Sequence, residues 1–231
     1  MILLGHRGAR RYAAENTFAA FDLALEHGCD GFEFDVRLTA DARLIICHGA
    51  RLGRRSIARS TLAALSEASA RGERRGSAAA LPPPCLEDVL ERYAERAFLD
   101  IELKVAGLEQ MVLNLLRRHR PRRVLVSSFW PDVLQALRER ERGLRLGFLS
   151  DRPHTLRRFR ELDVQVVLPH YTLASRRVLT QLKAADKEVI VWTVNRERSM
   201  RRFAALGVDG MISDDTALLA RAFRTASQQL P

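Results

Sequence analysis

Cysteine is scarce in this 231-residue sequence, and its three copies form no recognisable pattern. Cys29, Cys47 and Cys85 are odd in number and lack the close spacing of metal-binding cysteines. This argues against a disulfide framework and against a cysteine metal site. We therefore expect reduced thiols, which are typical of a cytoplasmic protein.

Long apolar runs are also absent. Met1–Leu4 leads directly into Gly5–Gly8, so the N-terminus lacks the basic start, the longer apolar region and the cleavage site of a signal peptide. No apolar run approaches membrane-spanning length. We expect a soluble, cytoplasmic protein without a membrane segment.

Lysine is almost missing, so nearly all of the formal charge of +10 comes from arginine. Such a charge favours anionic partners and could steer an anionic substrate. However, the arginines alternate with acids in helix-like segments such as Arg138–Arg142, and no aromatic-plus-basic nucleic-acid motif accompanies them. Solvated helix faces are the simpler interpretation. We expect a small-molecule substrate and no nucleic acid, and the sequence makes no prediction of oligomeric state.

What the sequence does contain is a regular alternation of strand-like and helix-like runs. The strand-like runs are 2–6, 31–37, 43–48, 98–104, 124–128, 144–149, 164–168, 188–194 and 209–213. The helix-like runs are 17–27, 86–96, 108–119, 131–141, 154–162, 174–185, 197–206 and 215–226. Repeated strand–helix units in a chain of this length predict a single-domain TIM (β/α)₈ barrel. Nine strand-like runs for eight places mean that one is extra or very short. A doubly wound open sheet is the alternative, although the glycine-rich dinucleotide fingerprint is missing.

Residues 49–85 are the least regular part of the chain. Arg51–Arg55 is loop-like, Thr61–Ala70 could form a helix, and Arg71–Ala80 is small, basic and weakly patterned. Pro82–Pro84 then forces an extended entry into the next helix. We interpret 49–85 as a short insertion on the barrel rim after the third strand, so that residues 1–231 form one domain.

Two carboxylates lie two residues apart in the strand-like run Gly31–Arg37. Because side chains alternate along a strand, Glu33 and Asp35 share one face, and Phe32, Phe34 and Val36 share the other. Adjacent carboxylates repel each other, and a hard divalent cation such as Mg²⁺ or Ca²⁺ would resolve that repulsion. A solvent-facing edge strand is the alternative.

Further polar residues gather at the predicted strand ends, where the active site of such a barrel lies. Glu102 and Lys104 share a face because Leu103 between them points away. The complete set comprises His6, Glu33, Asp35, His48, Glu102, Lys104, Trp192, Thr193 and Asn195.

This set of residues suits the cleavage of a phosphodiester. Glu33, Asp35 and Glu102 would hold one divalent cation. Arg7 and Lys104 would stabilise the negative charge that develops on the phosphoryl group. His6 and His48 would supply a general acid and a general base, since an imidazole has a pKa near ~6.5.

The same residues lie in motifs that resemble those of the glycerophosphodiester phosphodiesterases over nearly the whole chain. The matching motifs are His6-Arg7-Gly8, Glu15-Asn16-Thr17, Glu33-Phe34-Asp35-Val36, His48, Glu102-Leu103-Lys104, Ser127-Ser128-Phe129, Val191–Asn195 and Gly207–Asp214. Each motif is short, but their order and spacing together are specific.

The resemblance implies a TIM barrel of the phospholipase C-like phosphodiesterase type and divalent-cation-dependent hydrolysis of glycerophosphodiesters to glycerol 3-phosphate and an alcohol. It implies Glu33, Asp35 and Glu102 as metal ligands, with Mg²⁺, Ca²⁺ or Mn²⁺ as the cation. It also implies His6 and His48 as the catalytic pair, and Arg7 and Lys104 as phosphate ligands. In the mechanism it implies, the 2-hydroxyl of the glycerol attacks phosphorus, and a cyclic intermediate is then hydrolysed.

The sequence departs from the family pattern at two places. Gly49 follows His48 where the family usually has Asp, which removes an acid that could orient the imidazole or support the metal. The segment after it is short and arginine-rich, so we expect an atypical leaving alcohol, and an anionic one is an option. The alternatives are a lysophospholipid or other phosphodiester as substrate, or a non-catalytic barrel that binds phosphorylated ligands or nucleic acid.

Three further features of the sequence bear on the site. Trp192 either lines the site, against the glycerol carbons, or belongs to the core. Cys47 should point away from the face of His48 and pack against helices. His170 and Tyr171 follow a strand end and are weaker candidates for the rim.

Overall fold

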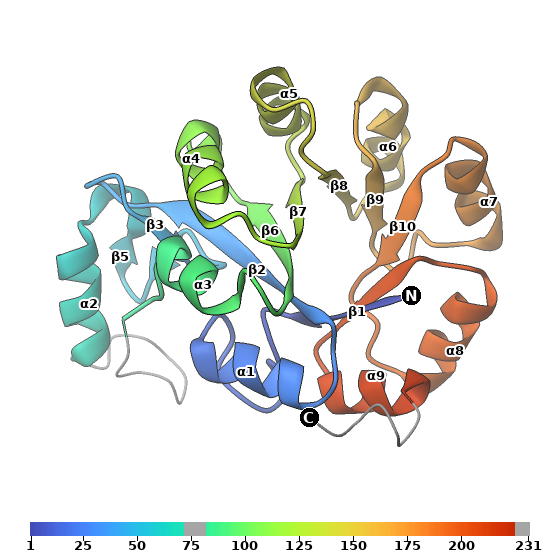
Figure 1. Ribbon diagram of the computed structural model, residues 1–231, viewed down its shortest axis with the longest axis horizontal. Helices are drawn as coiled ribbons and strands as arrows, with labels where there is room; N and C mark the ends of the chain where they lie inside the picture. Colours follow the sequence, from blue (N-terminus) through green and yellow to red (C-terminus); the bar gives the residue numbers. More distant parts are fainter. Residues whose placement is uncertain (72–81, 225–231) are drawn as a thin grey trace.

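Eight parallel strands close into a barrel in the computed structural model, which describes residues 1–71 and 82–224 (Figure 1). Strand β1 pairs with both β2 and β11, and these two pairings close the ring. In order around the barrel, the strands are β1 (Ile2–His6), β2 (Gly31–Leu38), β6 (Phe98–Leu103), β7 (Arg123–Ser128), β8 (Leu146–Ser150), β9 (Val166–Pro169), β10 (Glu188–Val191) and β11 (Gly210–Ser213). The predicted TIM barrel is confirmed, and the open sheet is excluded.

Helices surround the barrel and cover its outer face (Figure 1). They are α1 (Phe18–Glu26), α3 (Leu86–Tyr93), α4 (Glu109–His119), α5 (Pro131–Arg140), α6 (Pro153–Leu156) with the 3₁₀ helix η2 (Arg157–Glu161), α7 (Arg176–Ala184), α8 (Glu197–Ala205) and α9 (Thr216–Phe223). The last helix was expected to reach residue 226, and positions 225 and 226 lie outside the described residues. None of the helices in the described ranges is long and apolar enough to cross a membrane.

Of the nine strand-like runs, the extra one is 43–48, and it lies outside the barrel. Strand β3 (Leu44–Ile46) runs antiparallel to β2, with Val36 opposite Ile46 and Leu38 opposite Leu44. The prediction that this run is the third barrel strand is therefore wrong. Only five residues separate the two strands, which allows a hairpin but not the long crossover that a parallel pair requires. Strand β6 takes the third place and pairs directly with β2.

The described part of the insertion packs on β3. It contains β4 (Arg51–Leu52), β5 (Arg55–Ser56), the 3₁₀ helix η1 (Ile57–Arg59) and α2 (Leu62–Ala70). Its apolar cluster consists of Ile45, Cys47, Leu52, Ile57, Leu65 and Cys85. Cys47 is thus buried away from the barrel, as its alternation with His48 predicted. Of the weakly patterned run 71–80, all but Arg71 lies outside the described residues.

The alternation of side chains along β2 decides which groups enter the barrel. Phe32 and Phe34 point outward, where Phe21 of α1 stacks on Phe32 with a ring separation of 4.2 Å and Tyr93 of α3 meets Phe32 edge-on. All four rings are fully buried. Burial of such rings makes a large contribution to stability. It therefore fixes the register of β2 and turns Glu33 and Asp35 toward the barrel interior.

Candidate active site

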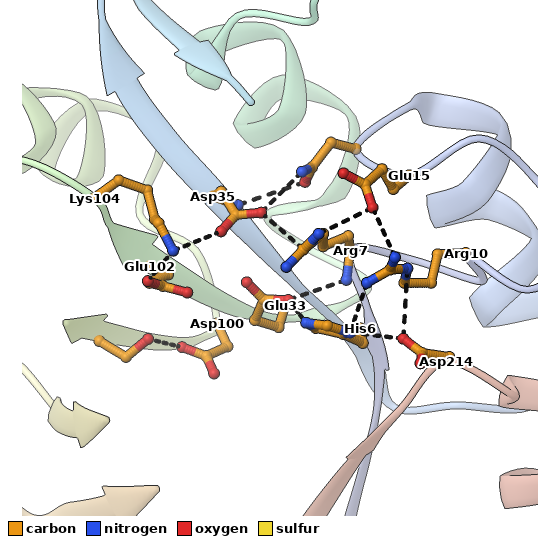
Figure 2. A network of polar contacts seen from close by, with 12 residues as sticks. His6, Arg7, Arg10, Glu15, Glu33, Asp35, Asp100, Glu102, Lys104 and Asp214 are labelled. Atoms are coloured by element: carbon orange, nitrogen blue, oxygen red, sulfur yellow. Dashed lines mark hydrogen bonds and ion pairs between the residues drawn. The ribbon is translucent and has the colours of Figure 1, made fainter. Parts of the chain in front are cut away.

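Three carboxylates meet inside one end of the barrel. Asp35 on β2 lies directly opposite Glu102 on β6 in the strand register, and Glu33 is two residues before Asp35. Oxygen atoms of the three side chains all lie within 4.8 Å of one another, and all three residues are buried. Figure 2 shows them converging from the two neighbouring strands.

The electrostatics of this cluster follow from burial and mutual repulsion. Burial, together with the charges of Asp35 and Glu102, raises the pKa of Glu33 well above its usual value. Burial and Asp35 raise the pKa of Glu102 to about 7. The pKa of Asp35 is lowered, because Lys104, Arg7 and a hydrogen bond from Asn16 outweigh its burial.

Two cationic side chains flank the carboxylates, as predicted. The Lys104 ammonium lies 2.6 Å from Glu102 Oε1 and 3.3 Å from Asp35 Oδ1. The Arg7 guanidinium lies 3.2 Å from Asp35 Oδ2 through Nε and donates to Glu15 at 2.9 Å. Arg7 has a positive φ of 53°, and this turn lets its backbone N–H donate to Glu33 Oε2 at 3.0 Å. The cations therefore neutralise only part of the buried negative charge.

The donor set fits a divalent cation. Two of its oxygens, Glu33 Oε1 and Asp35 Oδ1, are buried and accept no hydrogen bond from any residue that the structure describes, and Asp35 Oδ1 has only the ion pair with Lys104. A buried carboxylate oxygen without a hydrogen bond is costly. Mg²⁺, Ca²⁺ and Mn²⁺ all prefer such oxygen ligands, and one ion would satisfy both atoms at once.

His6 is held by a carboxylate from the far end of the chain. Its Nδ1 lies 2.6 Å from Oδ1 of Asp214, which follows β11, and its Nε2 lies 3.9 Å from Glu33 Oε2 (Figure 2). Asn195 donates to Asp214 Oδ2 at 2.6 Å and fixes that carboxylate. Burial lowers the pKa of His6, although Asp214 opposes the change.

His48 reaches the same cleft by a different route from the one predicted. His48 follows strand β3, which runs antiparallel to β2 and leads the chain back to the cleft. Just before His48, the backbone N–H of Cys47 donates to the backbone carbonyl of Asp35 at 2.9 Å. Arg37 donates two hydrogen bonds to the backbone carbonyl of His48, at 3.0 and 2.8 Å. Burial lowers the pKa of the His48 imidazole. The hairpin, not the end of a barrel strand, positions this residue.

A cleft of about 440 Å³ connects these groups. Its lining residues are His6, Arg7, Glu33, Arg37, His48, Glu102, Lys104, Phe129, Trp130, Leu149, Asp151, Trp192 and Ile212. Trp192 both lines the cleft and is anchored in the protein, since its indole N–H donates to Leu168 O at 2.8 Å and its ring meets Phe129 edge-on. His170 packs against Trp192 with the ring centroids 5.1 Å apart, outside the lining.

Sequence reasoning missed two acids of the site. Asp214 directly follows β11, and the rule that strand ends carry the active site would have found it. Asp100 precedes Glu102 by two residues and therefore shares its inward face. It is fully buried and accepts a hydrogen bond from Ser127 at 2.7 Å, and burial raises its pKa to about 7.

A second group of possible metal ligands lies on the outside of the barrel. Glu87 and Glu91 on α3 approach His119 at the end of α4. Here Glu91 is exposed, and Arg118 is bound to Glu87. Among the described residues, the buried carboxylate cluster is therefore the better cation site.

Comparison with known proteins agrees with the fold. Residues 6–218 match the model of the glycerophosphoryl diester phosphodiesterase family. Glycerophosphodiester phosphodiesterases of Bacillus altitudinis and Caldanaerobacter subterraneus are 31% and 28% identical over 229 and 240 residues. These alignments cover 92% and 96% of this chain, and 94% and 98% of the relatives. The structure of an Oleispira antarctica phosphodiesterase in complex with the product sn-glycerol-3-phosphate has a TM-score of 0.86 and 25% identity, with 97% of both chains covered.

Proposed function

The chain belongs to the glycerophosphoryl diester phosphodiesterase family, and from that premise we propose that it hydrolyses glycerophosphodiesters to glycerol 3-phosphate and an alcohol with the aid of one divalent cation. One observation carries the proposal. The buried cluster of Glu33, Asp35 and Glu102 borders a single cleft, which Glu33 and Glu102 line together with two imidazoles and the cationic side chains of Arg7 and Lys104.

Glu33, Asp35 and Glu102 would hold the cation. When bound, it would act as a Lewis acid toward the phosphoryl oxygens. Arg7 and Lys104 line the cleft beside these carboxylates. Their charges would stabilise the negative charge that grows on the phosphoryl group.

His6 and His48 would divide two proton transfers. One imidazole takes the proton of the attacking hydroxyl, and the other gives a proton to the departing alkoxide. In this proposal the attacking group is the 2-hydroxyl of the glycerol. The bond from phosphorus to that oxygen forms as the bond to the alcohol breaks, and water then opens the cyclic phosphate to glycerol 3-phosphate. Asp214 acts here as a positioning residue, because it fixes the His6 ring and stabilises its protonated form.

The test is the release of glycerol 3-phosphate from a panel of glycerophosphodiesters with Mg²⁺, Mn²⁺, Ca²⁺ or EDTA. We expect cation-dependent release that Glu33→Ala abolishes. Glu91→Ala is the matched control, since it removes an exposed carboxylate of the outer group on α3, and it should retain activity. Phosphorus NMR of the reaction should detect the cyclic phosphate.

The other substrate classes are separate outcomes of the same assay. Release only from lysophospholipids would mean that the substrate of this site is a lysophospholipid and not a water-soluble glycerophosphodiester. Folded protein that binds the cation but hydrolyses no diester would identify a binding barrel without turnover.

A further inference from the structure

The two sides of the cleft differ in chemistry. The lining residues on β1, β2 and β6, and those just after β1, β3 and β6, are all ionisable. The lining residues on β8 and β11, and those just after β7, β8 and β10, are apolar or aromatic with one exception, Asp151, which directly follows β8. A substrate phosphate belongs on the ionisable side, so the other side is left for the organic parts of the substrate.

The outer part of the apolar side carries one indole and one carboxylate. The side chain of Asp151 is 52% exposed, and Trp130 is the most exposed large apolar residue of the described chain at 58%. Trp192, Leu149 and Ile212 lie deeper on the same side. An exposed indole at the mouth of a cleft is typical of a ligand contact.

The carboxylate of Asp151 is available for a ligand. Its nearest cation is Arg152, whose Nε lies 4.0 Å away and whose side chain is 70% exposed. A pair of exposed side chains at this distance contributes little. Arg152 does not line the cleft, whereas Asp151 does.

We infer that Trp130 and Asp151 form a subsite for a cationic leaving alcohol, such as the quaternary ammonium of choline or the ammonium of ethanolamine. The inference rests on the proposed function and names the alcohol that it releases. An indole face attracts an ammonium group through the ring quadrupole, and a carboxylate attracts it by charge. The subsite lies at the mouth, where the alcohol must leave after the bond to phosphorus breaks.

The arginines of the insertion do not contradict this inference. None of the described residues 49–71 lines the cleft, so the arginines that suggested an anionic alcohol do not contact its described lining. Besides Arg7 and Lys104, Arg37 is the one arginine or lysine among the described residues of the lining, and it is bound to the carbonyl of His48. An anionic alcohol on the apolar side would meet Asp151 and be repelled.

The decisive comparison uses two diesters of glycerol phosphate, one with choline and one with 3,3-dimethylbutan-1-ol, which has the same shape without the charge. We expect kcat/KM to favour the choline ester by about three- to tenfold, the size of an exposed cation–π contact combined with an exposed ion pair. Asp151→Asn and Trp130→Ala should each bring the ratio toward one. A ratio of one or less in the unmodified protein, or a ratio that neither variant changes, would overturn the inference.

The matched control is Asp186→Asn. Asp186 is exposed and precedes β10, at the opposite end of the barrel from the cleft. Its φ of 55° suits asparagine as well as aspartate, and the change removes the same charge as Asp151→Asn. This variant should keep the preference for the choline ester.

A second measurement separates this inference from the proposed function. The only two tryptophans of the sequence, Trp130 and Trp192, both line the cleft, so tryptophan fluorescence reports binding there. In EDTA, where no turnover is expected, the choline ester should bind more tightly than its uncharged analogue, and Asp151→Asn should abolish the difference. Tighter choline binding without hydrolysis under any cation would refute the proposed function alone, and equal binding of the two esters would refute the subsite.

Discussion

The Nδ1 atom of His6 and the Oδ1 atom of Asp214 lie 2.6 Å apart, although the two residues are separated by 208 positions in the chain. Closure of the barrel through β1 and β11 brings them together. Since Nδ1 donates to the carboxylate, the ring has one tautomer and its Nε2 faces the side of Glu33. In the proposed mechanism, this contact would prepare the imidazole for proton transfer before a substrate binds.

Asp214→Asn should therefore slow turnover without removing the cation. The charge of Asp214 raises the pKa of His6 against the effect of burial, so its loss should move the His6 step of the pH–rate profile to lower pH. We expect kcat/KM to fall by about tenfold or more, a part of the full contribution of a general acid or base. Unchanged pH dependence in this variant would contradict the positioning role, and Asp186→Asn is again the control.

His6→Ala and Glu33→Ala should separate chemistry from cation binding. In His6→Ala, calorimetry should show cation binding close to that of the unmodified protein, while kcat falls by about 10²–10⁴-fold because a proton-transfer group is lost. In Glu33→Ala, the cation affinity itself should fall, because a ligand with a free buried oxygen is removed. Loss of the cation in His6→Ala would show that the histidine is a ligand.

Asp100→Asn should stabilise the cation-free protein, and more so at higher pH. Burial raises the pKa of Asp100 from 3.8 to about 7. Between about pH 4 and pH 7, the folded state therefore holds a proton that the unfolded state has already released. The free energy of unfolding falls as the pH rises through this range. The variant avoids that loss and can still accept the hydrogen bond of Ser127. Its gain should grow from pH 5 to pH 8, to about 4 kcal/mol at most.

Chemical denaturation in EDTA measures this gain at the two pH values. The urea midpoints of Asp100→Asn and the unmodified protein should differ more at pH 8 than at pH 5. A constant difference would mean that Asp100 is ionised throughout in the folded protein. Addition of Mg²⁺ serves as a further check, because a ligand that binds only the folded state should stabilise both proteins.

Gly31→Ala should disrupt the barrel beneath the site. A Cβ at Gly31 would lie 1.8 Å from the carbonyl oxygen of Phe98 on β6, so the two strands could not keep their spacing. We expect a loss of several kcal/mol in the free energy of unfolding, comparable to severe overpacking. Gly143→Ala is the control, since nothing lies within 4 Å of its Cβ, and it should leave the thermal midpoint nearly unchanged.

Local patterns were sufficient to predict the barrel and its carboxylates. The alternation of strand-like and helix-like runs identified all eight barrel strands, within a few residues at each end. The period of two along β2 and β6 placed Glu33, Asp35 and Glu102 on inward faces. Both inferences depend only on neighbouring residues, because the alternation of a strand and the amphipathicity of a helix are encoded within one segment.

The remaining features depend on contacts between distant segments. The sequence showed that no helix fits between β2 and β3, yet only the pairing of Val36 with Ile46 revealed that β3 leaves the barrel and returns His48 to the cleft. The partner of His6 likewise could not be read from either segment alone. The sequence by itself thus determined the fold and the three clustered carboxylates Glu33, Asp35 and Glu102, since these are set by local periodicity. Only the tertiary structure decided which residues meet, because closure of the barrel and the register of its strands set the distances between residues far apart in the chain.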